Sequence, residues 1–146
     1  MSSQIAIRFK KLVPQAAVPL QAHPGDAGFD LVSRETLRIE AGGRALVHTG
    51  LAVEIPTGYE GQVRPRSGLA LKHGVTVLNA PGTIDSGYRG EIGVILANFG
   101  SGSFDIGPGD RIAQLVIAPV ATVKVDVAAE LSKTERGEGG FGSTGM

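Results

Sequence analysis

Five short segments of this sequence mix glycine with charged or hydroxyl side chains. They are AGFDL (27–31), PRSGLA (65–70), GTIDSGYRGE (82–91), GDRIAQL (109–115) and RGEGGFGSTG (136–145). In the third segment, Asp85 follows an apolar residue and precedes Tyr88 by three positions. A carboxylate in such a place can accept a proton from water. An aspartate in a β-turn is also commonly a simple cap of that turn, so both interpretations stay open.

The second segment offers groups that bind phosphate. Arg66 precedes Ser67 at the start of an expected short helix over residues 67–74. A helix N-terminus with free amides beside a guanidinium suits an anion, although a turn with a serine cap would use the same residues.

The fourth segment, residues 109–115, has the pattern of a structural turn. Asp110 and Arg111 predict a turn with an ion pair that anchors a strand. Gln114 differs, because its polar amide extends from an expected strand in which the residues around it are apolar.

The fifth segment holds five glycines in ten residues, so ordering it costs roughly 1–2 kcal/mol per residue. Arg136, Phe141, Ser143 and Thr144 add a cation, an aromatic face and two hydroxyls, and glycine amides can turn toward an anion. These groups predict a flap for a phosphorylated aromatic ligand, with a disordered end as the alternative. A phosphate loop is excluded, because serine stands where that loop needs lysine.

Composition narrows the possible functions. The 14 basic and 14 acidic residues cancel, which argues against duplex nucleic acid or an acidic membrane as partner. No cysteine is present, so disulfides and thiolate zinc sites are excluded. The three histidines lie far apart and lack metal-ligand spacing. Without a signal-type or membrane-spanning run, we expect a soluble cytoplasmic protein.

The elements that position these segments are predicted to be strands. With 22 Gly and 8 Pro in 146 residues, the chain is broken into short apolar runs. Ten such runs at near-regular spacing predict an all-β sandwich or barrel with one short helix. The runs are QIAIRF (4–9), FDLVS (29–33), TLRIE (36–40), ALVHT (45–49), LAVEI (51–55), GQVRP (61–65), VTVLN (75–79), EIGVILANF (91–99), RIAQLVIAPV (111–120) and TVKVDV (122–127). Two of them, 91–99 and 111–120, are apolar on both faces, which predicts the centre of the fold or contact with another subunit.

In this order, the five segments resemble the signature motifs of the homotrimeric dUTPase family, the deoxyuridine triphosphate nucleotidohydrolases. The resemblance covers nearly all of the chain. It implies a jelly-roll β-sandwich, a symmetric homotrimer and active sites shared by three chains. It also implies a core over residues 1–135 and a flexible C-terminal arm, residues 136–146, that closes over the active site of another subunit.

The implied reaction is hydrolysis of dUTP to dUMP and pyrophosphate by attack of water on the α-phosphorus. This reaction keeps uracil out of DNA and supplies dUMP for dTMP synthesis. Asp85 is the implied catalytic residue. Mg²⁺ is the implied cofactor, held mainly by substrate phosphates and water with no direct protein ligand. Asp30, Asp110 and Arg111 are implied to support the phosphate-binding groups.

The implied substrate-binding residues fall into three groups. A hairpin over residues 77–88 binds uracil and places Tyr88 under the deoxyribose, where it excludes UTP. The hairpin group is Asn79, Gly82, Thr83, Ile84 and Tyr88. The phosphate group is Arg66, Ser67, Gly68 and Gln114. The arm group is Arg136, Phe141, Gly142, Ser143 and Thr144, with Phe141 stacked on uracil and the polar residues at the γ-phosphate.

Two alternatives remain beside this interpretation. A dCTP deaminase of the same fold would carry a different Arg/Ser pattern near the second segment and a glutamate in place of Asp85. A catalytically inactive dUTP-binding regulator would have a damaged base or a truncated tail. The expected partners are therefore dUTP and further copies of the chain, with no nucleic acid and no membrane.

Overall fold

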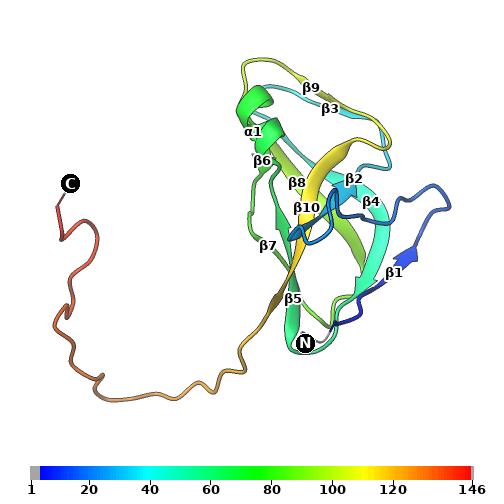
Figure 1. Cartoon of the computed structure of the whole chain (residues 1–146). Coiled ribbons are helices and arrows are strands. Elements are labelled where there is room, and N and C mark those ends of the chain that lie inside the picture. The colour runs from blue at the N-terminus through cyan, green and yellow to red at the C-terminus, as the bar shows by residue number, and fades with distance from the viewer. Residues whose placement is uncertain (1–3, 146) are drawn as a thin grey trace.

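Ten strands and one short helix form within residues 4–145, the part of the chain that the computed structural model describes (Figure 1). The strands are β1 (Arg8–Lys11), β2 (Gly28–Val32), β3 (Leu37–Ile39), β4 (Arg44–Glu54), β5 (Tyr59–Arg64), β6 (Val75–Val77), β7 (Gly82–Ile84), β8 (Glu91–Asn98), β9 (Phe104–Ile106) and β10 (Arg111–Pro119). The helix is α1 (Ser67–His73). The all-β prediction with one short helix is confirmed.

The strands form two four-stranded antiparallel sheets around one core. The first sheet has the order β1-β4-β8-β6 and the second β2-β10-β5-β7, while β3 and β9 pair separately. Buried side chains from both large sheets, such as Val94 of β8 and Leu115 of β10, belong to a single apolar cluster. Burying this surface stabilises the sandwich by roughly 25 cal/mol per Å² of apolar area. Both runs predicted to be apolar on two faces, β8 and β10, lie inside their sheets.

Strand β4 joins two runs that the sequence predicts as separate strands. Val47 pairs with Val94 and Ala52 with Glu91, with an irregularity between them. Gly50 lies in this irregularity with φ of 74°, and a Cβ there would approach Val13 Cγ2 to 2.7 Å. Glycine therefore permits the strand to bend and continue, because β8 pairs with both halves.

The helix α1 confirms the prediction for residues 67–74, but its cap differs from the expected serine cap. Arg66 occupies the N-cap position and makes no side-chain capping hydrogen bond, so Ser67 is the first helical residue. The helix ends at Gly74, whose φ of 67° is left-handed and whose N–H donates to the carbonyls of Ala70 and Leu69.

The predicted strand at 122–127 is wrong for this single chain. After Pro119 the residues up to 145 form no strand and extend away from the sandwich, as the orange-to-red trace in Figure 1 shows. Val123, Val125 and Val127 are at least 73% exposed. Their alternation needs an apolar face to cover it, and in the single chain the segment lies against neither sheet (Figure 1). We call residues 120–145 the C-terminal extension.

Two further observations complete the fold. The first predicted strand begins only at Arg8 rather than at residue 4. Among the described residues, no helix has the length and apolar character needed to cross a bilayer. Residues 1–3 and 146, which the expected core and arm include, lie outside the described residues.

Candidate active site

The segment from Val77 to Tyr88 links the two large sheets rather than forming the expected hairpin. Strand β6 pairs with β8, whereas β7 pairs with β5. The two strands stay apart because β7 is the edge strand of the second sheet, where buried Ile84 lies opposite Gly61 on β5. Gly82 fits closely here, since a Cβ on it would lie 3.3 Å from Val63 Cβ and 3.2 Å from Asn79 Nδ2.

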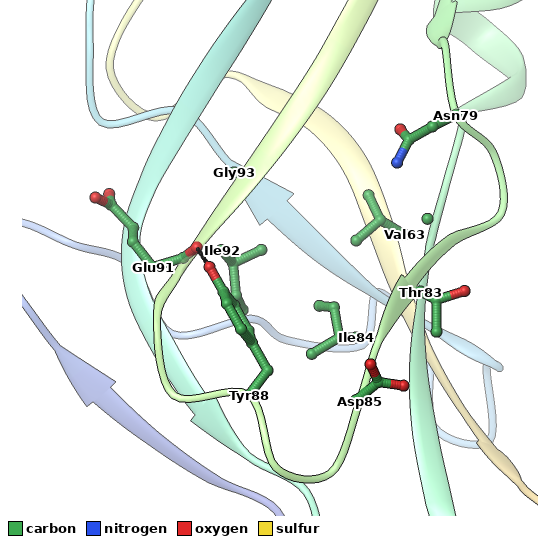
Figure 2. A pocket seen from close by; sticks show the side chains of 10 residues that line it. Val63, Asn79, Thr83, Ile84, Asp85, Tyr88, Glu91, Ile92 and Gly93 are labelled. Carbon is green, nitrogen blue, oxygen red and sulfur yellow. Dashed lines mark hydrogen bonds between the residues drawn. The ribbon is translucent and has the colours of Figure 1, made fainter.

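A cavity of about 190 Å³ lies at this connection (Figure 2). Its lining unites every residue predicted for the uracil and sugar group with Asp85, namely Asn79, Gly82, Thr83, Ile84, Asp85 and Tyr88. We call it the nucleoside pocket. The sequence did not predict the other four lining residues, which are Val63, Glu91, Ile92 and Gly93. Of these four, only Glu91 could have been suspected from the sequence, because it is the last residue of the segment 82–91 that contains Asp85.

Asp85 lies at the rim of the nucleoside pocket, at the end of β7. Its side chain is exposed and reachable by water. The Tyr88 amide donates to the Asp85 carbonyl at 3.0 Å, which closes a turn between the two residues. The Tyr88 hydroxyl donates to the Glu91 carbonyl at 2.8 Å, the dashed line in Figure 2. The turn thus supplies to one pocket a carboxylate and an aromatic ring whose hydroxyl is already bonded.

A second cavity, of about 350 Å³, gathers the residues predicted for the phosphates. We call it the anion pocket. It is lined by Ala22, Asp26, Ala27, Gly28, Asp30, Arg66, Ser67, Gly68, Arg111 and Gln114. Sequence reasoning did not assign Ala22, Asp26, Ala27 or Gly28 to a site, although the AGFDL segment contains two of them. Two guanidiniums, one hydroxyl and one amide provide the N–H and O–H donors that a polyanion needs.

Asp30 lies between the two arginines of the anion pocket. One carboxylate oxygen is 3.7 Å from Arg66 Nε, and the other is 3.8 Å from Arg111 Nη1. Arg66 Nη1 also donates to the Arg111 carbonyl at 3.2 Å. The expected Asp110–Arg111 ion pair is therefore replaced by an Asp30–Arg111 contact. Asp110 instead accepts the Gly107 amide at 2.8 Å, which holds the turn that precedes β10.

The two cavities remain separate in one chain. They have no lining residue in common, so Asp85 does not face the anion pocket. The arm residues are in neither lining. Phe141 is fully exposed at φ of 49°, and Arg136 Nε donates to the Gly139 carbonyl within the extension. The single chain therefore assembles two of the three predicted groups, each in its own place.

Within residues 4–145, no group of three or more His, Asp or Glu side chains is arranged so that it could hold a metal ion. Of the two aspartates that line the anion pocket, Asp26 and Asp30, the second already lies beside two guanidiniums. These residues fit a ligand that brings its own metal-binding oxygens better than they fit a metal held by protein alone.

Comparison with known proteins decides the family. The dUTPase family model matches residues 14–145 of this sequence. The chain belongs to the dUTPase family. A deoxyuridine 5'-triphosphate nucleotidohydrolase of Crocosphaera subtropica is 58% identical over 140 residues, covering 96% of this chain and 99% of that protein.

Solved dUTPase structures share the fold. The Staphylococcus bacteriophage 80alpha dUTPase with dUPNHPP superposes with a TM-score of 0.91 at 34% identity, covering 98% of this chain and 100% of that one. A mutant dUTPase from phage phi11 of S. aureus, described with a structural Mg(II) ion, has a TM-score of 0.82 at 29% identity, covering 88% and 100%. Family membership confirms the resemblance, and neither the deaminase nor the inactive regulator is favoured for this dUTPase.

Proposed function

We propose that this chain is a dUTP diphosphatase that hydrolyses dUTP to dUMP and pyrophosphate. The observation that carries the proposal is the nucleoside pocket, where Asp85 stands at the rim beside Tyr88, in a chain of the dUTPase family. The reaction keeps uracil out of DNA and supplies dUMP for dTMP synthesis. We further propose that the enzyme acts in the cytoplasm, on the pool of DNA precursors.

Asp85 is the catalytic residue of this proposal. Its exposed carboxylate orients a water molecule for attack on the α-phosphorus and accepts the proton that the water releases. The turn from Asp85 to Tyr88 fixes the carboxylate relative to the nucleoside. Holding the water and the phosphorus in the reacting geometry accounts for much of the rate, because both partners are then pre-oriented.

The nucleoside pocket selects the base and the sugar. The Asn79 amide and the main chain of residues 82–84 offer donors and acceptors to the uracil edge. Cytosine presents an amino donor at its 4-position, where uracil presents a carbonyl acceptor. A buried polar mismatch of this kind costs about 1–3 kcal/mol. Tyr88 lies under the deoxyribose in this proposal and leaves no room for a 2'-hydroxyl, which excludes UTP.

The anion pocket holds the triphosphate. Arg66, Ser67, Gly68 and Gln114 donate to phosphate oxygens, while Asp30 and Arg111 orient the Arg66 guanidinium. Mg²⁺ bound by the phosphates and water neutralises charge on the triphosphate. The protein's own part is to supply N–H donors at fixed positions and leave the α-phosphorus open to water.

A complete site needs more than one chain. We propose a homotrimer in which the nucleoside pocket of one subunit meets the anion pocket of a second. Support comes from the separation of the two cavities and from an apolar row on the outer face of the first sheet. In that row, Leu46 lies opposite Ile95 on the neighbouring strand, and the Leu78 amide donates to the Ile95 carbonyl. The Leu46 side chain is 51% exposed.

The arm, residues 136–146, then closes from a third subunit over the core formed by residues 1–135. Arg136, Gly142, Ser143 and Thr144 approach the γ-phosphate, and Phe141 stacks on uracil. Support comes from the reach of the extension and from the full exposure of Phe141 in the single chain. Ordering the glycines costs free energy only while the nucleotide is present to offset it.

The test is release of pyrophosphate from dUTP, dTTP, dCTP and UTP by purified protein with Mg²⁺. We expect dUTP alone to be turned over efficiently, with pyrophosphate and no orthophosphate as the inorganic product. Ammonia release from dCTP would instead establish the deaminase. Binding of dUTP without turnover would establish the inactive regulator.

A further inference from the structure

Glu91, at the start of β8, links two parts of the chain that are distant in sequence. Its carboxylate oxygen Oε2 accepts a hydrogen bond from Arg34 Nε at 3.0 Å and another from the Gly50 amide at 2.8 Å. Its side chain is only 23% exposed. Arg34 follows β2, and Gly50 lies in the bend of β4. The carboxylate therefore holds the first residue of β8 against both elements.

The main chain of Glu91 faces the other way, toward the nucleoside pocket. Its carbonyl accepts the Tyr88 hydroxyl at 2.8 Å. A Cβ on Gly90 would lie 2.5 Å from the Tyr88 hydroxyl oxygen, so the ring packs directly on the main chain before β8. In Figure 2 the Glu91 carboxylate points away from the cavity, and the Tyr88 ring reaches back to the Glu91 carbonyl. Glu91 thus holds the Tyr88 ring through its main chain, while its side chain points away from the cavity.

The ion pair between Arg34 and Glu91 is tightly constrained on the Arg34 side. The Arg34 amide donates to the His48 carbonyl at 3.0 Å, and a Cβ on Gly50 would lie 2.9 Å from Arg34 Cδ. The Arg34 hydrogen bond holds the pKa of Glu91 below its ordinary value, so the carboxylate stays ionised at neutral pH. Glu35 and His48 lie beside this pair and bond to each other through Glu35 Oε1 and His48 Nδ1 at 2.9 Å.

We propose that Arg34 and Glu91 are positioning residues that set where Tyr88 stands in the nucleoside pocket. Through Tyr88 they determine how well the enzyme separates deoxyribose from ribose nucleotides. The inference rests on the proposed function, because it assigns Tyr88 to the sugar. Neither side chain touches substrate in this scheme. Both act through the Glu91 carbonyl and the turn that carries Asp85.

The kinetic test compares Arg34→Met and Glu91→Gln with the wild type. The control is Arg38→Met, which removes a guanidinium from the ion pair between Arg38 on β3 and Asp105 on β9, at 2.7 Å. We expect the ratio of kcat/KM for dUTP to that for UTP to fall about tenfold in Arg34→Met, since a small misplacement of a positioned group costs up to about a hundredfold. Arg34→Lys should recover part of the ratio, because it restores the charge. Arg38→Met should leave the ratio unchanged.

Hydrogen exchange supplies a readout that does not depend on turnover. The Tyr88 amide is bonded to the Asp85 carbonyl, so its exchange reports opening of this turn. We expect faster exchange at residues 85–91 in Arg34→Met and in Glu91→Gln, measured well below each melting temperature, and no change in Arg38→Met. An unchanged dUTP/UTP ratio together with unchanged exchange in both variants would overturn the proposal.

The two proposals can fail separately. A wild type that turns over none of the four nucleotides would remove the proposed function, while the exchange comparison would still decide whether Arg34 and Glu91 position the turn. An equal loss of activity on dUTP and UTP, with exchange no faster at 85–91 than elsewhere, would mark the pair as a support for the whole fold and so overturn the inference.

Discussion

Gln114 occupies the space that a side chain on Gly28 would need. The two residues lie on the neighbouring antiparallel strands β10 and β2, and a Cβ on Gly28 would fall 2.2 Å from Gln114 Oε1. Gln114 crosses over Gly28 and donates its amide to the Pro65 carbonyl at 2.9 Å. This contact holds the residue before Arg66 and thereby sets one wall of the anion pocket.

The first prediction follows from that crossing. Gly28→Ala should displace Gln114 and raise KM for dUTP about tenfold, at a stability cost of about 1–3 kcal/mol from overpacking. Steady-state kinetics and thermal melting measure the two effects. The matched control is Gly102→Ala, because a Cβ at Gly102 meets no atom within 4 Å. Equal KM values for the two variants would mean that Gln114 has another acceptable position.

Asp85→Asn tests the proposed base. The amide keeps the size of the carboxylate at the rim of the nucleoside pocket but does not accept the proton of the attacking water. We expect more than a hundredfold loss in kcat, the scale of general base catalysis, with dUTP binding retained. Titration calorimetry with dUPNHPP measures the binding. Loss of binding together with rate would instead show that Asp85 holds the turn to Tyr88.

Local patterns in the sequence were sufficient for much of the anion pocket. Arg66 and Ser67 stand in a short segment whose composition already suggests phosphate, and the structure brings them together with Gln114, which only the family resemblance assigned to the phosphates. The pairing of Arg111 with Asp30 was not predictable in the same way. Those residues are 81 positions apart, and only the register of β10 on β2 brings them close. The nearer Asp110 was the natural but wrong partner.

The elements show the same limit. The short apolar runs predicted eight of the ten strands but missed β7 and β9, which have only three residues each. They also could not tell that β4 continues through Gly50, because that depends on pairing with β8. The TVKVDV run has the same alternation and forms no strand in this chain. Periodicity reports that a face can be buried, whereas the tertiary structure decides whether anything covers it. The link between Arg34 and Glu91 had no local signal at all.

Acid should weaken the Arg34–Glu91 link in a defined range of pH. Because the folded-state pKa of Glu91 is lowered by the Arg34 hydrogen bond, its contribution to stability is present above the unfolded pKa and is lost as pH falls through the folded one. We therefore expect Glu91→Gln to melt below the wild type at pH 7. The difference should shrink as pH falls below about 5, near the ordinary range of glutamate. A difference that stays constant from pH 7 to pH 3 would contradict the assignment.

Removal of the arm should separate folding from catalysis. A chain that ends at residue 135 lacks Arg136 and Phe141, and residues 136–145 make no hydrogen bond or ion pair to the described sandwich. We expect an unchanged melting temperature and a loss of most activity on dUTP, measured by pyrophosphate release. Phe141→Ala in the full chain isolates the aromatic face and should reproduce a substantial part of the loss. Full activity in the shortened chain would exclude closure by the arm.

Mixed oligomers test whether one active site draws on several chains. Asp85→Asn carries an intact arm and no base, while the chain ending at residue 135 carries the base and no arm. Each alone should be nearly inactive. If base and arm come from different subunits, trimers that contain both chains hold some sites with both parts, so unfolding and refolding the two together should restore activity. Light scattering should give three chains per particle before and after mixing. If each site is built from one chain, no mixed particle contains a complete site, and the mixture should stay as inactive as its components.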